Sequence, residues 1–162
     1  FYYGTYVDVN NATVYYATTQ FEIDEARHSM PCYDEPGIRA PIKLSVSHNP
    51  RYYAAANMPV LSSDVSATNP AYNTTVFQET PSMQTYLLAF LISNFKFKEA
   101  PVESTRIPQN IYAIPSAVDS GSADYAASIV GAVVRELENF IGFEFPLPKL
   151  DHVGRLSNAG DD

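Results

Sequence analysis

The spacing of apolar residues changes once along this chain of 162 residues, and the change limits what the chain can fold into. Up to about residue 98, short runs rich in Tyr, Val, Thr and Ile alternate apolar and polar side chains, which is typical of β-strands. From residue 122 onward, apolar residues recur every four positions, which is typical of an amphipathic helix. We therefore predict a mainly β chain whose strands are followed by a long helix.

The predicted strands are separated by turn-forming residues. Asn-Asn at 10–11, Asn-Pro at 49–50 and 69–70, and Thr-Pro at 80–81 fall between the alternating runs. The alternation predicts strands at residues 2–9, 13–20, 42–48, 52–56, 74–77 and 85–98, with a further short strand at 111–114.

The helix is predicted at residues 122–141. Ser122 is suited to cap its start and Gly142 to end it, while Pro146 prevents it from continuing. Its apolar stripe, which needs a packing partner, consists of Tyr125, Ile129, Val133, Leu137 and Ile141, widened by Ala126, Val130, Val134 and Phe140. Its charged residues Arg135, Glu136 and Glu138 are predicted to face solvent and to have no function.

A domain junction is predicted at residues 99–110. This stretch contains two prolines and mixed charges and shows little periodicity. We therefore predict a β-rich amino-terminal domain at residues 1–98 and the start of a second domain at 111–162.

Charge and hydropathy exclude some classes of function. The chain has 10 Lys and Arg against 18 Asp and Glu, and its net charge of −8 repels the phosphate backbone of nucleic acids. Its longest apolar run, residues 86–92, is far shorter than the roughly 18 residues of a membrane-spanning helix. We expect neither a nucleic-acid partner nor a transmembrane segment in this chain. Because it starts at Phe1 without a signal-peptide pattern, we expect it to be a piece of a longer protein.

The segment at residues 19–36, TQFEIDEARHSMPCYDEP, concentrates uncommon residues. On a strand, Gln20 and Glu22 share a face, where an amide and a carboxylate suit the binding of an ammonium group. Residues 23–30 are predicted to form one or two helical turns that end before Pro31. Residue types alone favour a second interpretation, a solvated strand face followed by an ordinary acidic turn.

The same segment resembles the stretch TQFExxxARxxFPC[FY]DEP of zinc aminopeptidases of the aminopeptidase N type, in the gluzincin family. Three further segments resemble that family in the same order: ANMPV (56–60), TYLLAF (85–90) and GFEFPLPKLD (142–151). The resemblance covers the chain from Phe1 to about Val153, and insect midgut membrane aminopeptidases N look closest. It implies a saddle-shaped antiparallel β-sheet domain, followed by the first strand and helix of a thermolysin-like α/β catalytic domain.

The resemblance also implies an activity for the parent protein. Such enzymes use zinc-bound water to hydrolyse the first peptide bond of a peptide, and Gln20 and Glu22 match residues that bind the free amino terminus. This chain would contribute the part of the active site that binds the substrate's amino group, and it is predicted to be inactive alone. The alternative is a receptor or antigenic module without catalysis, with protein ligands such as bacterial toxins. A stand-alone carbohydrate-binding β domain is disfavoured by the helix.

We predict no metal site in this chain, so the zinc belongs to the parent enzyme. The HExxH motif of zinc peptidases is absent, and His28, His48 and His152 are widely separated. The family's GxMEN loop does not follow residue 151, and the sequence departs from the family after Val153. Cys32, the one cysteine, is either a buried small hydrophobe, which we expect, or a free reactive thiol.

Two N-glycosylation sequons occur, at Asn11-Ala12-Thr13 and Asn73-Thr74-Thr75. The resemblance implies the secretory pathway and a position on the extracellular face of the plasma membrane, with the anchor outside this chain. We therefore predict Asn11 and Asn73 as glycosylation sites.

Overall fold

The computed structural model describes residues 2–154. By its internal contacts the chain divides into two compact units. Unit 1 comprises the chain up to Thr5 together with Tyr15–Asn94, and unit 2 comprises Tyr6–Val14 and the chain from Phe95 on. The domain junction at residues 99–110 stays a prediction.

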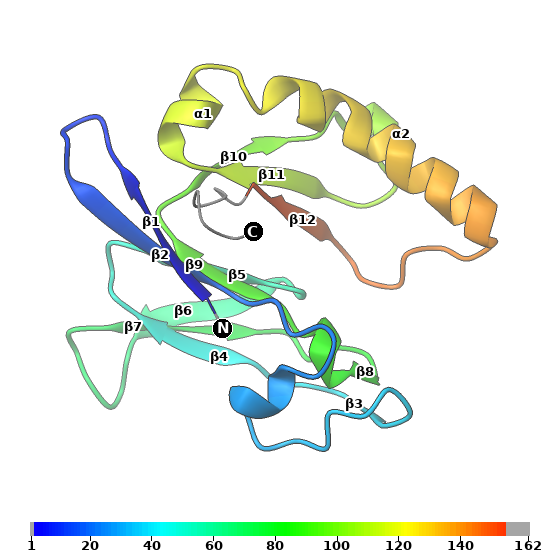
Figure 1. Cartoon of the computed structure of the whole chain (residues 1–162), viewed down its shortest axis with the longest axis horizontal. Coiled ribbons are helices and arrows are strands. Elements are labelled where there is room, and N and C mark those ends of the chain that lie inside the picture. Colours follow the sequence, from blue (N-terminus) through cyan, green and yellow to red (C-terminus); the bar gives the residue numbers. More distant parts are fainter. Residues whose placement is uncertain (1, 155–162) are drawn as a thin grey trace. The chain divides into compact units, whose positions relative to one another are not determined.

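Antiparallel sheets dominate the first part of the chain, which confirms a mainly β architecture (Figure 1). One sheet has the strand order β1-β2-β9-β5, a second has the order β4-β7-β6, and β3 pairs with β8. The strands are β1 (Tyr2–Val7), β2 (Thr13–Thr18), β3 (Arg39–Ala40), β4 (Ser45–His48), β5 (Tyr53–Ala56), β6 (Val60–Val65), β7 (Asn73–Phe77), β8 (Met83–Gln84) and β9 (Phe90–Ser93). Short 3₁₀ turns lie at Ala26–His28, Thr85–Leu87 and Val102–Ser104.

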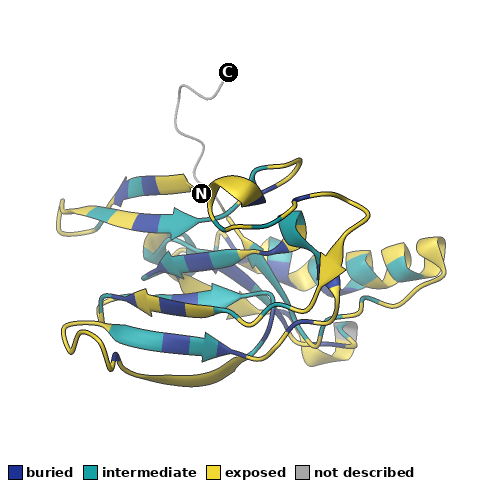
Figure 2. Cartoon of the chain, turned by 90° about the horizontal axis from the view of Figure 1, so that it is seen from below, coloured by how far each residue is buried: buried dark blue, intermediate teal, exposed yellow. Residues whose placement is uncertain are grey.

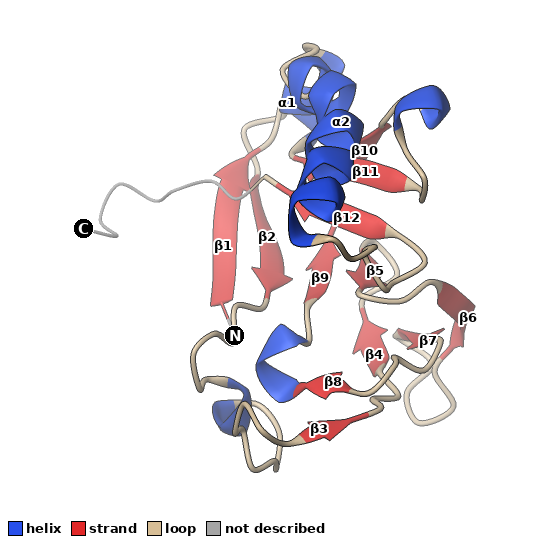
Figure 3. Ribbon diagram, turned by 90° about the vertical axis from the view of Figure 1, so that its right-hand side faces the viewer, coloured by secondary structure: helices blue, strands red, loops and turns tan. Residues whose placement is uncertain are grey.

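Unit 2 contains a mixed sheet and the helices. Its strands are β10 (Lys96–Glu99), β11 (Gln109–Ala113) and β12 (Leu150–Val153), and its helices are α1 (Pro115–Asp119) and α2 (Asp124–Ile141). Strand β11 pairs antiparallel with β10 and parallel with β12. The two helices connect β11 to β12, as parallel neighbours require, and α2 lies against the sheet (Figure 3). Ile111 on β11 packs against Ala123 and Ala127.

The predicted strands differ in how well they match the structure. The strands predicted at residues 52–56 and 74–77 are confirmed as β5 and β7. The predicted strand at 85–98 is wrong, because this stretch is a 3₁₀ turn followed by β9 and β10. The Asn57 amide donates to the carbonyl oxygen of Leu87 (3.0 Å) and accepts from the N–H of Ala89 (2.7 Å), so it occupies backbone groups that a continuous strand would use. Strand β6 was not predicted because all of its residues are exposed and do not alternate.

The predicted helix is confirmed as α2, and its start differs from the prediction. Ala123, not Ser122, occupies the N-cap position, and the Ser122 hydroxyl instead lies 2.9 Å from the hydroxyl oxygen of Ser120. Gly142 ends the helix as predicted. Its φ of 74° is left-handed, and its N–H donates to the carbonyl oxygen of Glu138 (2.8 Å).

The face of α2 that packs on the sheet is narrower than the predicted stripe. Ala127 and Gly131 are buried, and Val130 and Val134 are half-buried. Five residues of the predicted stripe, Tyr125, Ile129, Val133, Leu137 and Ile141, are exposed, whereas Ala126, Val130 and Val134 of the same stripe are half-buried. Figure 2 colours much of α2 as exposed. Small side chains thus allow α2 to approach the sheet, Val130 packs beside them, and the largest apolar side chains stay exposed.

Glu138 is not the solvent-facing charge that was predicted. Its Oε1 accepts hydrogen bonds from Nη2 of Arg106 (2.8 Å) and from the N–H of Phe145 (2.7 Å). Arg106 Nη2 also donates to the carbonyl oxygen of Phe145 (3.0 Å). The hydrogen bond from Arg106, followed by that from Phe145, holds the pKa of the Glu138 carboxyl below its usual value. These bonds fasten the segment after α2 to the helix.

We expect Gly142→Ala to lower the free energy of unfolding by about 1 kcal/mol, because an L-residue in the left-handed region costs roughly that much. A Cβ added at Gly142 meets no atom within 4 Å, so the cost comes from the backbone alone. Denaturant titration measures it. Gly37→Ala is the matched control, because its added Cβ also meets nothing within 4 Å. Equal stability of the two variants would contradict the assignment.

Candidate functional site

The segment at residues 19–36 leaves the sheet earlier than predicted. Strand β2 ends at Thr18, so the strand predicted to reach Gln20 is two residues too long. Thr19 still contacts β9: its N–H donates to the carbonyl oxygen of Phe90 (3.2 Å), and its Oγ1 accepts from the N–H of Phe90 (2.9 Å). The Thr19 hydroxyl takes the place of the next ladder bond, and the loop begins there.

Gln20 and Glu22 lie exposed on either side of a buried side chain. Phe21 is only 2% exposed and belongs to a core cluster with Ala26, Met83 and Leu88. Phe21 thus points into the core, while its two neighbours stay at the surface. The peptide bond that follows Glu22 is cis. The two predicted site residues therefore lie on a loop surface of unit 1 and not on a strand.

The helical turn predicted within residues 23–30 is present in a short form. It is a 3₁₀ turn at Ala26–His28, and the N–H of Met30 donates to the carbonyl oxygen of Ala26 (3.0 Å). The N–H of Glu25 donates to the carbonyl oxygen of Phe21 (2.9 Å). Ala26 is fully buried, so the turn packs on the same core as Phe21.

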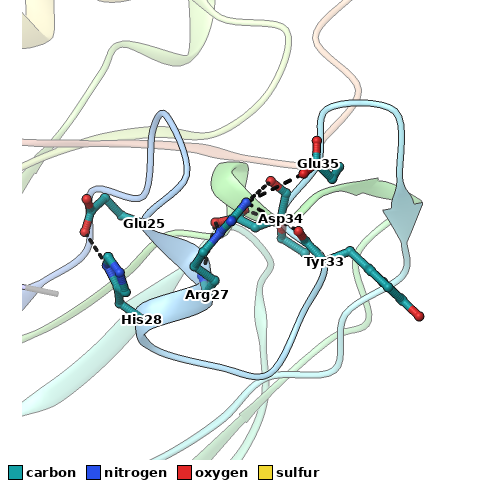
Figure 4. Close-up of polar contacts among 7 residues, drawn as sticks. Glu25, Arg27, His28, Tyr33, Asp34 and Glu35 are labelled. Carbon is teal, nitrogen blue, oxygen red and sulfur yellow. Dashed lines mark hydrogen bonds and ion pairs between the residues drawn. The ribbon is translucent and has the colours of Figure 1, made fainter.

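Asp34 is the polar centre of the segment (Figure 4). Its side chain has no exposed surface, and its backbone is left-handed with φ 51°. The Thr85 hydroxyl donates to Oδ1 (2.7 Å), and the backbone N–H of Arg27 donates to Oδ2 (3.1 Å). The Arg27 guanidinium lies 3.6 Å from Oδ2 through Nε, and its Nη2 donates to the carbonyl oxygen of Asp34 (3.0 Å).

These contacts decide the charge state of Asp34. Burial alone would raise the pKa of its carboxyl group. The hydrogen bonds from Thr85 and from the Arg27 backbone, together with the Arg27 charge, outweigh that effect and lower the pKa below its ordinary value. Asp34 is therefore a buried carboxylate whose charge is compensated.

The neighbours of Asp34 contribute less. Glu35 Oε1 lies 3.8 Å from Arg27 Nη2, and the Nδ1 of His28 lies 2.8 Å from Glu25 Oε2, all between well-exposed side chains. Exposed ion pairs of this kind stabilise little. Cys32 is half-buried against the Phe21 cluster, where a small apolar side chain was expected.

The three resembling segments of unit 1 meet around this loop. Thr85 and Phe90 of TYLLAF bind Asp34 and Thr19 of the first segment. Asn57 of ANMPV binds the backbone of the same TYLLAF stretch. Thr85 and Asn57 were not predicted as site residues, although their place inside the resembling segments was a usable signal. The fourth segment, GFEFPLPKLD, belongs to unit 2.

The described residues do not fit a zinc site. Within residues 2–154, no three His, Cys, Asp or Glu side chains lie close enough together to hold a metal ion. The histidines have other neighbours: His28 contacts Glu25, His48 Nε2 lies 2.9 Å from Thr75 Oγ1, and His152 Nε2 lies 3.1 Å from Gln109 Oε1. Residues 2–154 contain no helix that is both long enough and apolar enough to cross a membrane.

The two sequons have different surroundings. Asn11 is exposed in the β1–β2 turn with φ 62°, and Asp8 Oδ1 accepts from the N–H of Ala12 in that turn (2.8 Å). Asn73 is half-buried at the start of β7, the central strand of its sheet. The hydroxyl of its sequon residue Thr75 is buried beside His48.

We expect Asp34→Ala to lower the free energy of unfolding by about 2–3 kcal/mol, because hydrogen bonds to a charged group contribute about 1.5–3 kcal/mol. Glu35→Ala is the matched control from the same turn and is expected to change stability by less than about 0.5 kcal/mol. Denaturant unfolding at neutral pH measures both, and equal losses would contradict the central role of Asp34.

The pH dependence gives a second check of that prediction. A carboxyl whose folded pKa is lowered contributes stability above its unfolded pKa, and the contribution is lost as the pH falls through the folded value. The ordinary pKa is 3.8, so the difference between wild type and Asp34→Ala should persist down to about pH 4 and shrink below it. A difference that stays constant down to pH 2 would mean that the Asp34 charge contributes nothing.

Comparison with known proteins gives the family. Residues 1–87 match the model of the peptidase M1 N-terminal domain. Aminopeptidase N of Rattus norvegicus and aminopeptidase N of Homo sapiens are each 37% identical over 99% of this chain and 16% of their own length. The thyrotropin-releasing hormone-degrading ectoenzyme of Rattus norvegicus is 35% identical over 93% of this chain and 14% of its own length. The chain thus spans about one sixth of these relatives, and it belongs to the peptidase M1 family.

Proposed function

We propose that this chain is the amino-terminal part of a cell-surface zinc aminopeptidase, in which Gln20 and Glu22 bind the free amino group of the peptide substrate. The supporting observation is the exposure of both side chains around the buried Phe21. A carbonyl oxygen of the amide and a carboxylate accept hydrogen bonds from an ammonium group. Because the buried Phe21 already holds this loop in place, the loop loses little conformational freedom when it binds the substrate.

The names of the relatives support the substrate class and the location. Two relatives are called aminopeptidase N, and a third is an ectoenzyme that degrades a hormone. By analogy, the substrate of the whole protein is a peptide with a free amino terminus, outside the cell. The anchor in the membrane lies outside this chain in this proposal.

The chain's own contribution ends at the amino group of the substrate. Because residues 2–154 offer no metal-binding group, we assign them no part in zinc chemistry. The metal of the parent enzyme would act as a Lewis acid and activate water for peptide hydrolysis. The chain alone is therefore proposed to be inactive.

The finer architecture belongs to the same proposal. Residues 1–98 would form the saddle-shaped domain, and β11 with α2 would be the first strand and helix of a thermolysin-like catalytic domain at residues 111–162. Insect midgut enzymes were the expected nearest group, and binding of bacterial toxins was the alternative function. The named relatives are vertebrate peptidases, so the peptidase function is the one we propose.

We expect Glu22→Ala, in the full-length enzyme, to lower kcat/KM for an amino-acid arylamide by about 10- to 100-fold, because a hydrogen bond to a charged group contributes about 1.5–3 kcal/mol. The loss should lie mainly in KM, since the group binds the substrate amine. Glu22→Gln keeps the shape and removes the charge, so it should reproduce most of the loss.

Asp24→Asn is the control for Glu22, because Asp24 is exposed on the same loop two residues further on. We expect it to leave kcat/KM unchanged within twofold. If Glu22→Ala behaved like this control, the amine-binding role would be wrong.

We also propose that Asn11 and Asn73 carry glycans to different extents. We expect Asn11 to be fully occupied because its sequon is exposed, and Asn73 to be occupied in only part of the molecules. Thr75, which the glycosylating enzyme must reach, is buried once β7 has paired with β4 and β6. Endoglycosidase-sensitive mass shifts of secreted Asn11→Gln and Asn73→Gln variants measure the occupancies. A fully occupied Asn73 beside an unmodified Asn11 would contradict this expectation.

A further inference from the structure

Helix α2 has apolar residues on two of its sides. One side, with Ala127 and Gly131 at its centre, packs against the sheet of unit 2. A second side carries large apolar residues four positions apart: Tyr125, Ile129, Val133 and Leu137. The third side is polar and includes Ser128, Arg135 and Asn139. We call the second side, including Phe140, the outer apolar face.

Within unit 2, the outer apolar face is open to solvent. Tyr125 is 75% exposed, Leu137 is 52% exposed and Phe140 is 89% exposed. Ile129 and Val133 are 38% and 48% exposed. Residues four apart on a helix are neighbours, so these side chains form one continuous stripe. Soluble proteins rarely leave a stripe of this kind uncovered, and a helix that is apolar on several sides is normally buried on them.

The charges of α2 help to choose among the possible partners. The helix carries Asp124, Glu136 and Glu138 against a single basic residue, Arg135. Helices that lie on membrane surfaces usually have a Lys- and Arg-rich polar side, which α2 lacks. A lipid surface is therefore a poor partner for this face.

The length of the relatives points to a partner within the same polypeptide. The chain aligns with only 16% of aminopeptidase N of Rattus norvegicus, so such a protein has about five times as much further chain to place. We propose that the outer apolar face is an intramolecular interface, covered by apolar side chains of the polypeptide that follows this chain in the full-length protein. This inference rests on family membership and does not depend on the roles of Gln20 and Glu22.

Cysteine accessibility in the natural full-length gene product tests the proposal. Leu137→Cys places a thiol on the outer apolar face, and Asn139→Cys places one on the polar side of the same helix. Labelling by a maleimide in the folded protein is compared with labelling in denaturant, and the unsubstituted protein gives the contribution of Cys32 and other native thiols. We expect protection of position 137 by at least about tenfold, because a buried thiol reacts only when its site opens, and little protection of position 139.

Each other outcome overturns the proposal. Equal labelling at positions 137 and 139 means that nothing covers the face. Protection that disappears on dilution assigns the face to a second copy of the protein, and protection that needs added lipid vesicles assigns it to a membrane. A gene product that ends at residue 162 removes the proposed partner altogether.

If Leu137→Cys does not fold, as judged by circular dichroism, Ile129→Cys is the second variant for the same face. Because labelling does not report on peptide binding, its outcome is separate from the kinetic test of Glu22.

Discussion

The loop arrangement of unit 1 depends on the hydrogen bonds and the positive charge that compensate one buried carboxylate. Asp34 has no exposed side-chain surface, and an uncompensated charge there would cost several kcal/mol, on the order of 3–5. Its partners come from both directions: Arg27 precedes it by 7 residues, and Thr85 follows it by 51. The acidic turn, the 3₁₀ turn at Ala26–His28 and the TYLLAF stretch therefore reach their positions together.

The same constraint explains why Gln20 and Glu22 face outward. Phe21 and Ala26 share a core with Met83 and Leu88, and Asp34 joins the end of that loop to the beginning of TYLLAF. Thr19 joins the start of the loop to Phe90 at the other end of the same stretch. With both ends fixed and the middle buried, the two polar side chains are held on the surface. Preorganisation of this kind reduces the conformational entropy that the loop loses when it binds an ammonium group.

The spacing of apolar residues along the chain predicts an element most clearly where that element buries one face. Strand β7 was predictable because it buries one face, whereas β6 buries neither face and was missed. The period of α2 predicted a helix, but it did not reveal which side meets the sheet, because Ala127 and Gly131 carry little hydrophobic signal. Gln20 and Glu22 came from a resembling motif. The supporting contacts of Thr85 and Asn57 span 51 and 32 residues, and only the fold brings such residues together.

The central claim is that Gln20 and Glu22 receive the amino group of a peptide. The most direct measurement is a crystal structure of the full-length protein with a non-hydrolysable peptide analogue that has a free amino terminus. We expect the amino nitrogen to lie within hydrogen-bond distance, about 2.7–3.2 Å, of the side-chain oxygens of both residues. An amino terminus bound elsewhere, with Gln20 and Glu22 still facing solvent, would contradict it.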